Sequence, residues 1–434
     1  MRRTTIHRAL APAAVLLAAI AMSLAPLPAL AQQHFDAVDT IPWTSLGGFP
    51  AYEAAPVVPT EFWVQAGALH DSNIFRLSKD ANARAITGSD DRSDNILRLG
   101  AGVRHEQRIF GRQRVLLEAR GEQYNYDRNS QLDHFAYGLR GEWLWEFTND
   151  LSGTLGYERR KRLIDLAQVQ TTVKDMITEQ HSYATAAYQL GPTVRLRGGL
   201  DNTRGEHSDP LLDAAEVRIN TVTGAVDYVT ALGNALGVEA RRSNGNAPVT
   251  QIVGGTPVDN EFTETEIALV GTAVAGTTLR GTARLGHTRR KHVEFPERNF
   301  TGTTGRLNVS WAPLQKTAFE FAAYREPRSI IDIAASYVVV TGVSFGPRWA
   351  PREKLVFSAL LVHENQDFRG DPNQAVLGTP ERQEVLRGIR LAAGWEPKRF
   401  IEVSAGLEHG QRTSNVLLRD YDYNAVMANV RWRF

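Results

Sequence analysis

A two-residue alternation of polar and apolar residues runs from residue 61 to the end of the chain. In the final segment, Val430 and Trp432 fall on one face. Asn429 and Arg431 fall on the other face. Successive side chains of an extended strand point to opposite sides, so this period predicts strands with one apolar and one polar face.

The alternation divides into about eighteen segments, separated by connections that are alternately short and long. The predicted strands cover residues 61–71, 93–109, 113–126, 133–147, 151–162, 178–190, 193–206, 216–229, 234–244, 261–274, 277–293, 299–312, 317–329, 337–350, 354–368, 384–396, 400–412 and 421–434. An even number of long strands with short turns on one side and long loops on the other is typical of bacterial outer-membrane barrels. Lipid does not satisfy the backbone groups of an open sheet edge, so the sheet must close. We therefore predict an all-β, transmembrane, antiparallel up-and-down β-barrel of about 18 strands in the outer membrane.

Soluble sandwiches and propellers are the alternative to a barrel. Their strands usually have about five or six residues, whereas these segments have roughly ten or more, as a tilted membrane span requires. Aromatic residues near strand ends are expected to form an interfacial girdle. They are Trp63, Trp143, Trp145, Trp311, Trp349, Trp395 and Trp432.

The N-terminal segment resembles a secretory signal. Arg2, Arg3 and Arg8 precede or open an apolar stretch that ends in Pro28-Ala29-Leu30-Ala31. A basic start, an apolar middle and a small-residue cleavage site predict a signal peptide over residues 1–31. Residues 32–60, rich in Pro, Gly and Ala, are predicted to be a linker, a periplasmic tail or a plug, and residues 61–434 the barrel.

Composition excludes several classes of protein. The chain has no Cys, so it has no disulfide framework, thiolate metal site or cysteine nucleophile. Its 49 basic and 48 acidic residues leave no basic excess of the kind that a nucleic-acid partner requires. No metal or cofactor is expected.

The polar faces of the strands carry interleaved Arg and carboxylate residues, which we predict line a hydrated lumen. The candidates are Arg98, Arg104, Glu118, Arg120, Glu122, Arg140, Glu142, Arg195, Arg197, Asp201, Arg280, Arg284, Glu402, Arg431 and Arg433. Such groups suit sugar hydroxyls and acidic glycans, although cross-strand pairs that brace the wall would give the same pattern. Tyrosines near strand–loop junctions are candidates for stacking on sugar rings: Tyr124, Tyr126, Tyr421 and Tyr423.

Catalytic and metal-binding patterns are weak. The run from Glu206 to Asp209 contains His and Ser, but adjacent residues rarely converge as a triad does. Asp90, Asp91 and Asp94 lack the glycine and distal Glu of a calcium loop. The basic runs 159–162 and 289–292 lie at loop-side strand ends, where solvent, anionic lipopolysaccharide or an acidic glycan would contact them. We predict no catalytic residue and no enzymatic activity.

One segment carries a family resemblance. The sequence from Asp71 to Leu77, DSNIFRL, ends the first strand and resembles outer-membrane proteins of the β-barrel porin group, and most closely its EpsL branch. That branch is associated with exopolysaccharide biosynthesis. Arg98-Leu99-Gly100-Ala101-Gly102, Tyr124-Asn125-Tyr126 and the Phe434 ending support the resemblance. It implies an outer-membrane barrel that helps to move exopolysaccharide to the cell surface, and it brings no catalytic or cofactor residues.

The sequence thus predicts passive passage of a glycan through a mixed-charge lumen. A general diffusion porin for small solutes stays open as an alternative, and a surface hydrolase is a third. The partners expected are outer-membrane lipid and lipopolysaccharide, the exopolysaccharide chain, and periplasmic polysaccharide-export components. The C-terminal strand ending at Phe434 is expected to engage the barrel-insertion machinery.

Overall fold

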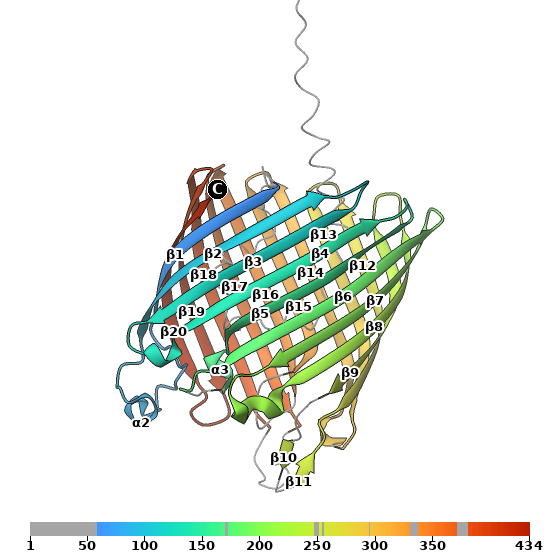
Figure 1. Cartoon of the computed structure of the whole chain (residues 1–434). Coiled ribbons are helices and arrows are strands. Elements are labelled where there is room, and N and C mark those ends of the chain that lie inside the picture. Colours follow the sequence, from blue (N-terminus) through green and yellow to red (C-terminus); the bar gives the residue numbers. More distant parts are fainter. Residues whose placement is uncertain are drawn as a thin grey trace, which may run out of the picture.

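Every barrel strand pairs antiparallel with its neighbours in a computed structural model of the chain (Figure 1). The structure describes residues 59–169, 172–246, 251–253, 256–294, 296–329, 337–370 and 381–434. The predicted signal peptide, 1–31, and all but the last two residues of the 32–60 segment lie outside the described residues.

Eighteen strands form one sheet. They are β1 (Thr60–Asp71), β2 (Asp94–Arg108), β3 (Arg114–Tyr126), β4 (His134–Glu146), β5 (Leu151–Leu163), β6 (Met176–Leu190), β7 (Val194–Glu206), β8 (Val217–Val229), β9 (Ala235–Asn246), β12 (Phe262–Ala275), β13 (Leu279–His292), β14 (Phe300–Leu314), β15 (Thr317–Ser329), β16 (Tyr337–Arg352), β17 (Leu355–Arg369), β18 (Gln383–Lys398), β19 (Ile401–Ser414) and β20 (Tyr421–Arg433). The predicted all-β barrel is confirmed, and each predicted strand end lies within two residues of the observed one.

The ring closes between the first and the last strand. β1 pairs with β2 along one edge and with β20 along the other, in a register that sets Val64 opposite Trp432. β9 pairs with β12, so the chain between them does not interrupt the wall. Closure leaves no free sheet edge, which is the condition for a sheet that crosses lipid.

Three hairpins extend further than predicted. The first residues of the predicted turns that follow Trp311, Trp349 and Trp395 are instead strand, with a register shift between each Trp and the residue three positions later. Each shift contains a proline, in the sequences WAPL, WAPR and WEPK. Proline lacks the N–H that a regular ladder needs, and a bulge accommodates it without ending the strand.

The outward face is apolar, and its exposed aromatic residues gather toward the short-turn end. Trp311, Trp349, Trp395 and Trp432 are each about half exposed on this face. Trp63 is a correction to the predicted girdle, because it is 8% exposed and has the same strand parity as the buried Gln65, facing inward.

Short elements that the sequence pattern did not predict lie in the connections. They are α2 (Ala83–Thr87), η3 (Ser130–Leu132), α3 (Leu166–Val169), η4 (Pro210–Ala215), the hairpin β10 (Gln251–Val253) and β11 (Thr256–Val258), and η5 (Pro296–Arg298). None of the helices in the described ranges is long and apolar enough to cross a membrane.

The long connections on one side of the barrel share a small hydrophobic core. Phe75, Leu132, Ile164 and Leu212 come from the connections after β1, β3, β5 and β7, and all are buried in one cluster. Burying side chains of this size stabilises the connections by about 1.5–3 kcal/mol each. These four connections therefore fold against one another rather than extending freely into solvent.

Substituting Gly102 with Ala is expected to lower the free energy of unfolding by about 1–3 kcal/mol, because a Cβ there would overlap the indole of Trp63. A Cβ at this position would lie 2.1 Å from a ring carbon. Gly224→Ala is the control, since nothing lies within 4 Å of its Cβ position. Unfolding in urea, followed by tryptophan fluorescence, measures both. Equal stability of the two variants would contradict this packing role.

Candidate channel lumen and its mouth

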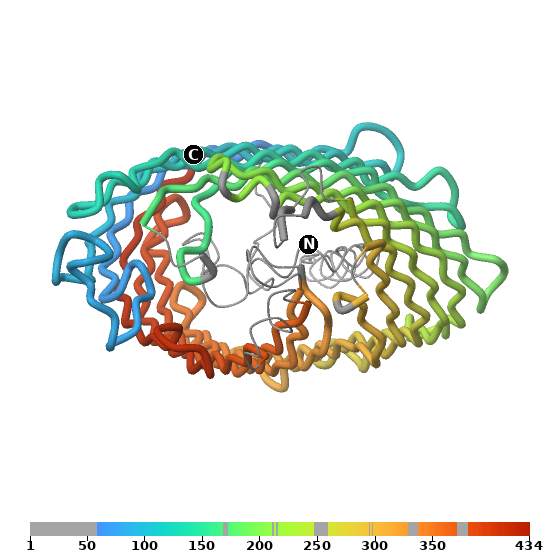
Figure 2. Tube along the Cα trace, turned by 90° about the horizontal axis from the view of Figure 1, so that it is seen from below, coloured from blue at the N-terminus to red at the C-terminus, as the bar shows by residue number. Residues whose placement is uncertain are grey.

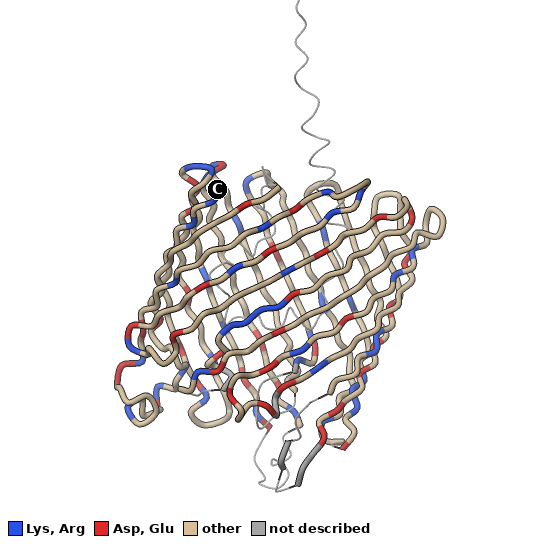
Figure 3. The backbone as a smooth tube through the Cα atoms, viewed as in Figure 1, with Lys and Arg blue, Asp and Glu red and all other residues tan. Residues whose placement is uncertain are grey.

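The predicted lumen-lining residues all lie on the face opposite the exposed apolar side chains. This holds for Arg98, Arg104, Glu118, Arg120, Glu122, Arg140, Glu142, Arg195, Arg197, Asp201, Arg280, Arg284, Glu402, Arg431 and Arg433. Residues of both signs recur around the whole ring rather than forming one block (Figure 3). The inner wall is therefore polar and of mixed charge.

Most of these groups pair across strands. The largest set, which we call the wall network, links β7, β8, β9, β12 and β13 through Arg195, Arg197, Asp227, Glu239, Arg241, Glu264, Glu266, Arg284 and Arg290. Within it, Arg284 contacts Glu239 at 2.5 Å and Glu266 at 2.6 Å. The carboxylates are almost covered by their partners, with Glu266 3% exposed.

The wall network has a mechanical and an electrostatic consequence. Arginine binds carboxylates through a fork of donors, which fixes both the position and the orientation of the side chains. Each carboxylate shared between two guanidinium groups neutralises part of their charge. A solute that crosses this wall meets a stiff surface of donors and acceptors with little net charge.

The end of the lumen near the short turns has a separate group. Arg433 pairs with Glu402 and lies 3.5 Å from Glu396. Arg431 donates to the side-chain oxygen of Gln65 at 3.1 Å, and its guanidinium lies over the ring of Trp63. The predicted pair Arg431 and Arg433 therefore lies on the inner face of β20, where Arg433 is ion-paired and Arg431 is bound by the Gln65 amide.

The DSNIFRL segment forms a tight turn attached to the last strand. Arg76 donates to the Asp71 carboxylate at 2.8 Å and lies 3.5 Å above the ring of Tyr423. The side chain of Asn73 donates to the carbonyl of Asp422 at 3.0 Å. Arg76 has a φ of +53°, a left-handed conformation rare for Arg, and these contacts hold it there. The motif thus binds the first long connection to β20.

A second connection reaches across the interior. The chain after β5, which contains α3, projects into the ring (green in Figure 2). Ala167 of this connection is fully buried, and its carbonyl accepts a hydrogen bond of 2.8 Å from Arg412 on β19. Strands β5 and β19 are not neighbours in the sheet, so this contact spans part of the opening.

The loop-side ends of β15 and β16 also bend into the ring (orange in Figure 2). Tyr337 and Val339 have the parity of outward residues, yet they are buried against Phe300. The Tyr337 hydroxyl donates to the Asn299 carbonyl at 3.0 Å. The mouth with the long connections is therefore narrower than the strand count alone implies.

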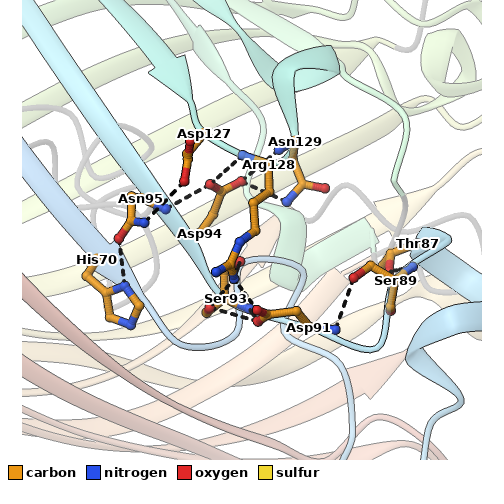
Figure 4. A network of polar contacts seen from close by, with 10 residues as sticks. All are labelled: His70, Thr87, Ser89, Asp91, Ser93, Asp94, Asn95, Asp127, Arg128 and Asn129. Carbon is orange, nitrogen blue, oxygen red and sulfur yellow. Dashed lines mark hydrogen bonds and ion pairs between the residues drawn. The ribbon is translucent and has the colours of Figure 1, made fainter.

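Two buried aspartates connect neighbouring long connections. Asp94 accepts from the backbone N–H groups of Arg128 and Asn129, each at 3.0 Å (Figure 4). Asp175 accepts from the N–H groups of Ser208 and Asp209, each at 2.8 Å. Both carboxylates are fully buried. Asp94 is the first residue of β2 and binds the connection after β3. Asp175 directly precedes β6 and binds the connection after β7.

The histidine and serine of the 206–209 run take part in the second of these contacts. His207 contacts Asp175 at 2.6 Å, and the Ser208 hydroxyl donates to the same carboxylate at 3.1 Å. Burial raises the pKa of Asp175, but the hydrogen bonds from His207 and from the backbone of Asp209 outweigh it and hold the pKa below its usual value. The His207 and Ser208 side chains both bind the Asp175 carboxylate, so this group of residues holds the connection in place as a structural clamp.

The acidic residues near Asp91 are likewise engaged by protein donors. Asp91 accepts from the backbone and hydroxyl of Ser93, which lower its pKa, and pairs with Arg128 (Figure 4). In the part of the chain that the structure describes, no group of His, Asp and Glu could hold a metal ion.

A cavity of about 220 Å³ lies inside the mouth, which we call the mouth cavity. Its polar lining includes Arg76, Arg120, Glu122, Tyr124, Tyr126, His134, Arg160, Glu408 and Tyr423, and its apolar lining includes Ile74, Ile96, Ile164 and Leu166. Arg120 lines this cavity and makes no ion pair with any described residue.

Three of the four predicted sugar-stacking tyrosines line this cavity and Tyr421 lies beside Tyr423, but all four rings are covered. Tyr124 stacks on His134 with ring centroids 4.7 Å apart. Tyr421 lies beneath Arg412, and Tyr423, 2% exposed, beneath Arg76. Tyr126 is buried in the hydrophobic core of the connections. Stacking on sugar stays a prediction, and it requires these covering side chains to move.

The fold and the polar lumen define a porin-like β-barrel of the outer membrane. From β12 to the C-terminus, residues 264–434 match the family model described as Putative beta-barrel porin 2. This match covers less than half of the chain. No curated protein sequence matches the chain.

Solved outer-membrane proteins align over most of the chain at low identity. OpdK of Pseudomonas aeruginosa is 9% identical, with 86% of this chain and 99% of that chain covered and a TM-score of 0.45. OccK2 (OpdF) of the same organism, in complex with glucuronate, is 10% identical, with 87% and 98% covered and a TM-score of 0.45. The alcaligin receptor FauA of Bordetella pertussis is 14% identical, with 86% and 76% covered and a TM-score of 0.41. Nothing about substrate follows from likenesses at this level.

Asp175→Ala is expected to lower the free energy of local opening of the 207–216 connection by about 1–3 kcal/mol, because it leaves buried N–H groups without an acceptor. The Asp175 carboxylate is charged at neutral pH. Its stabilising effect is lost only as the pH falls through the lowered pKa of Asp175, below the usual value of about 3.9. Hydrogen exchange at Ser208 and Asp209 measures this. Asp213→Ala, in the same connection, is the control and should change nothing. Protection that is lost well above pH 4 would contradict the clamp.

Proposed function

We propose that the chain is a passive channel for small hydrophilic solutes. The observation that carries this proposal is the combination of a continuous, mixed-charge inner wall with a mouth narrowed by folded connections. A barrel of 16–18 strands is wide enough for an aqueous channel unless something fills it. The wall network supports rapid passage, since its groups already satisfy one another and bind no solute strongly.

The narrowed mouth favours small solutes over a polymer. The 164–169 connection, fixed by the contact between Arg412 and Ala167, crosses part of the opening. The bent ends of β15 and β16 take up further space, held by Tyr337. A small solute passes beside these segments, whereas a growing polymer would need them to be displaced continuously.

In planar bilayers the purified chain is expected to give steady conductance. In liposomes it is expected to take up sugars at a rate that falls steeply as the sugar becomes larger. Arg412→Ala should raise mean conductance, because it releases the connection that contains Ala167. Gln411→Ala, the outward neighbour on the same strand, is the control. A barrel that inserts yet gives no conductance above that of an empty bilayer would overturn the proposal.

Exopolysaccharide export is a second candidate function. The mouth cavity favours it, because its lining combines tyrosine rings and apolar side chains with polar groups that recognise saccharides. These polar groups include the carboxylate of Glu122 and the guanidinium of Arg120, which pairs with no carboxylate among the described residues. On this hypothesis the covering side chains of Arg76 and Arg412 move aside during export.

Deleting the gene in its own host distinguishes the two functions. Export predicts that polysaccharide disappears from the surface and accumulates in the periplasm, and that Arg431→Ala with Arg433→Ala complements poorly if these residues contact glycan. A diffusion channel predicts normal secretion with slower uptake of small solutes. Normal surface polysaccharide in the deletion strain would exclude export.

A further inference from the structure

The outward face of one side of the barrel changes from apolar to cationic toward the long connections. On β5 the outward residues Leu151 and Leu155 are followed by Arg159 and Lys161. The same change occurs on β7, β8, β9 and β13. The cations that we group as the cationic face are Arg159, Lys161, Arg204, Arg218, Arg242, Arg289 and Lys291.

Strand register makes these positions one continuous surface. Arg204 on β7 lies directly opposite Arg218 on β8. Thr265 on β12 lies opposite Arg242 on one side and Arg289 on the other. Directly opposed side chains have Cβ atoms about 4.5–5.5 Å apart, so neighbouring guanidinium groups repel one another.

Few carboxylates lie among these outward strand positions. Across the outward strand positions of β5–β9, β12 and β13, Glu206 is the single carboxylate, and it pairs with Arg204. Arg218, Arg242, Arg289 and Lys291 are exposed. The outward strand positions therefore carry seven cations and one carboxylate. Glu216, Glu261 and Glu294 lie in the adjoining connections, where each accepts a hydrogen bond.

The remaining outward surface at the same end is balanced. Arg325 and Arg387 lie on β15 and β18, against Asp367 on β17 and Asp422 on β20. Arg369 on β17 pairs with Glu381. Strands β1–β4 present no charged Lys, Arg, Asp or Glu outward at this end. The excess of positive charge is thus confined to one side of the barrel.

We propose that the cationic face binds the headgroup of a multiply phosphorylated glycolipid in the outer leaflet. Lipid-facing charge is costly at the bilayer centre and becomes tolerable only at the interface. Long connections lie on the cell surface in barrels of this kind, so this interface is the outer one. Arginine binds phosphate with two parallel hydrogen bonds, and an array of arginines is complementary to an anion with more than one phosphate. The proposal concerns the outer wall and is independent of what the lumen conducts.

Binding of lipid A to the purified full chain in detergent tests the proposal, with native mass spectrometry as the readout. Diphosphoryl lipid A should bind more tightly than monophosphoryl lipid A or phosphatidylglycerol. The variant R218A/R242A/R289A should bind diphosphoryl lipid A roughly a hundredfold more weakly, since each surface cation contributes severalfold. The variant R325A/R387A, with two cations removed from the balanced side, is the matched control and should bind as the unchanged chain does.

Heat-modifiable migration on a gel checks that each variant is folded. If the triple variant does not fold, the single variants R218A and R242A carry the test, each with binding about fivefold weaker. Unchanged binding by the folded variants would overturn the proposal. Phosphatidylglycerol bound as tightly as diphosphoryl lipid A would overturn it too, because the face would then select charge alone.

Discussion

The pairing of β1 with β20 is the contact on which the rest of the structure depends. Lipid offers no hydrogen-bond partner for a backbone N–H or C=O, so the backbone of each strand must bond to that of a neighbouring strand. For the free edge of β1 this neighbour is β20. This closure separates the side chains into two environments. The outward set meets lipid and is apolar, while the inward set meets a lumen and is charged. The alternation of polar and apolar residues in the sequence follows from that separation.

Inside the barrel, charge pairing replaces the hydrophobic core of a soluble domain. The inner wall consists of cross-strand pairs such as Arg284 with Glu266 and Arg197 with Asp227. Apolar packing lies at the end with the long connections, both in the connections, where Phe75 and Leu132 are buried, and at the adjoining strand ends, where Tyr337 is buried. Ion pairing and apolar packing thus stabilise different parts of the barrel. The wall keeps a lumen open, whereas the core of the connections draws chain across one end of it.

The sequence predicts the strands well because a period of two persists over long segments and lipid enforces it. It also contains the information that places Trp63 inward, since that residue shares parity with Gln65, but an aromatic residue near a strand end predicts a girdle position. The WAPL, WAPR and WEPK hairpins extend beyond their predicted ends because a bulge accommodates the proline, and a period of two does not predict a bulge. The inward course of the 164–169 connection had no periodic signal. Its position depends on a contact between Ala167 and Arg412, far apart in the chain, which local sequence does not encode.

The attachment of the DSNIFRL turn to β20 implies an order of assembly. Asn73 and Arg76 bind groups of Asp422 and Tyr423 that exist as a surface only after the C-terminal strand has joined the sheet. The first long connection therefore remains without its support until the final strand is inserted. A barrel in which this turn has reached its final position has therefore already paired β1 with β20.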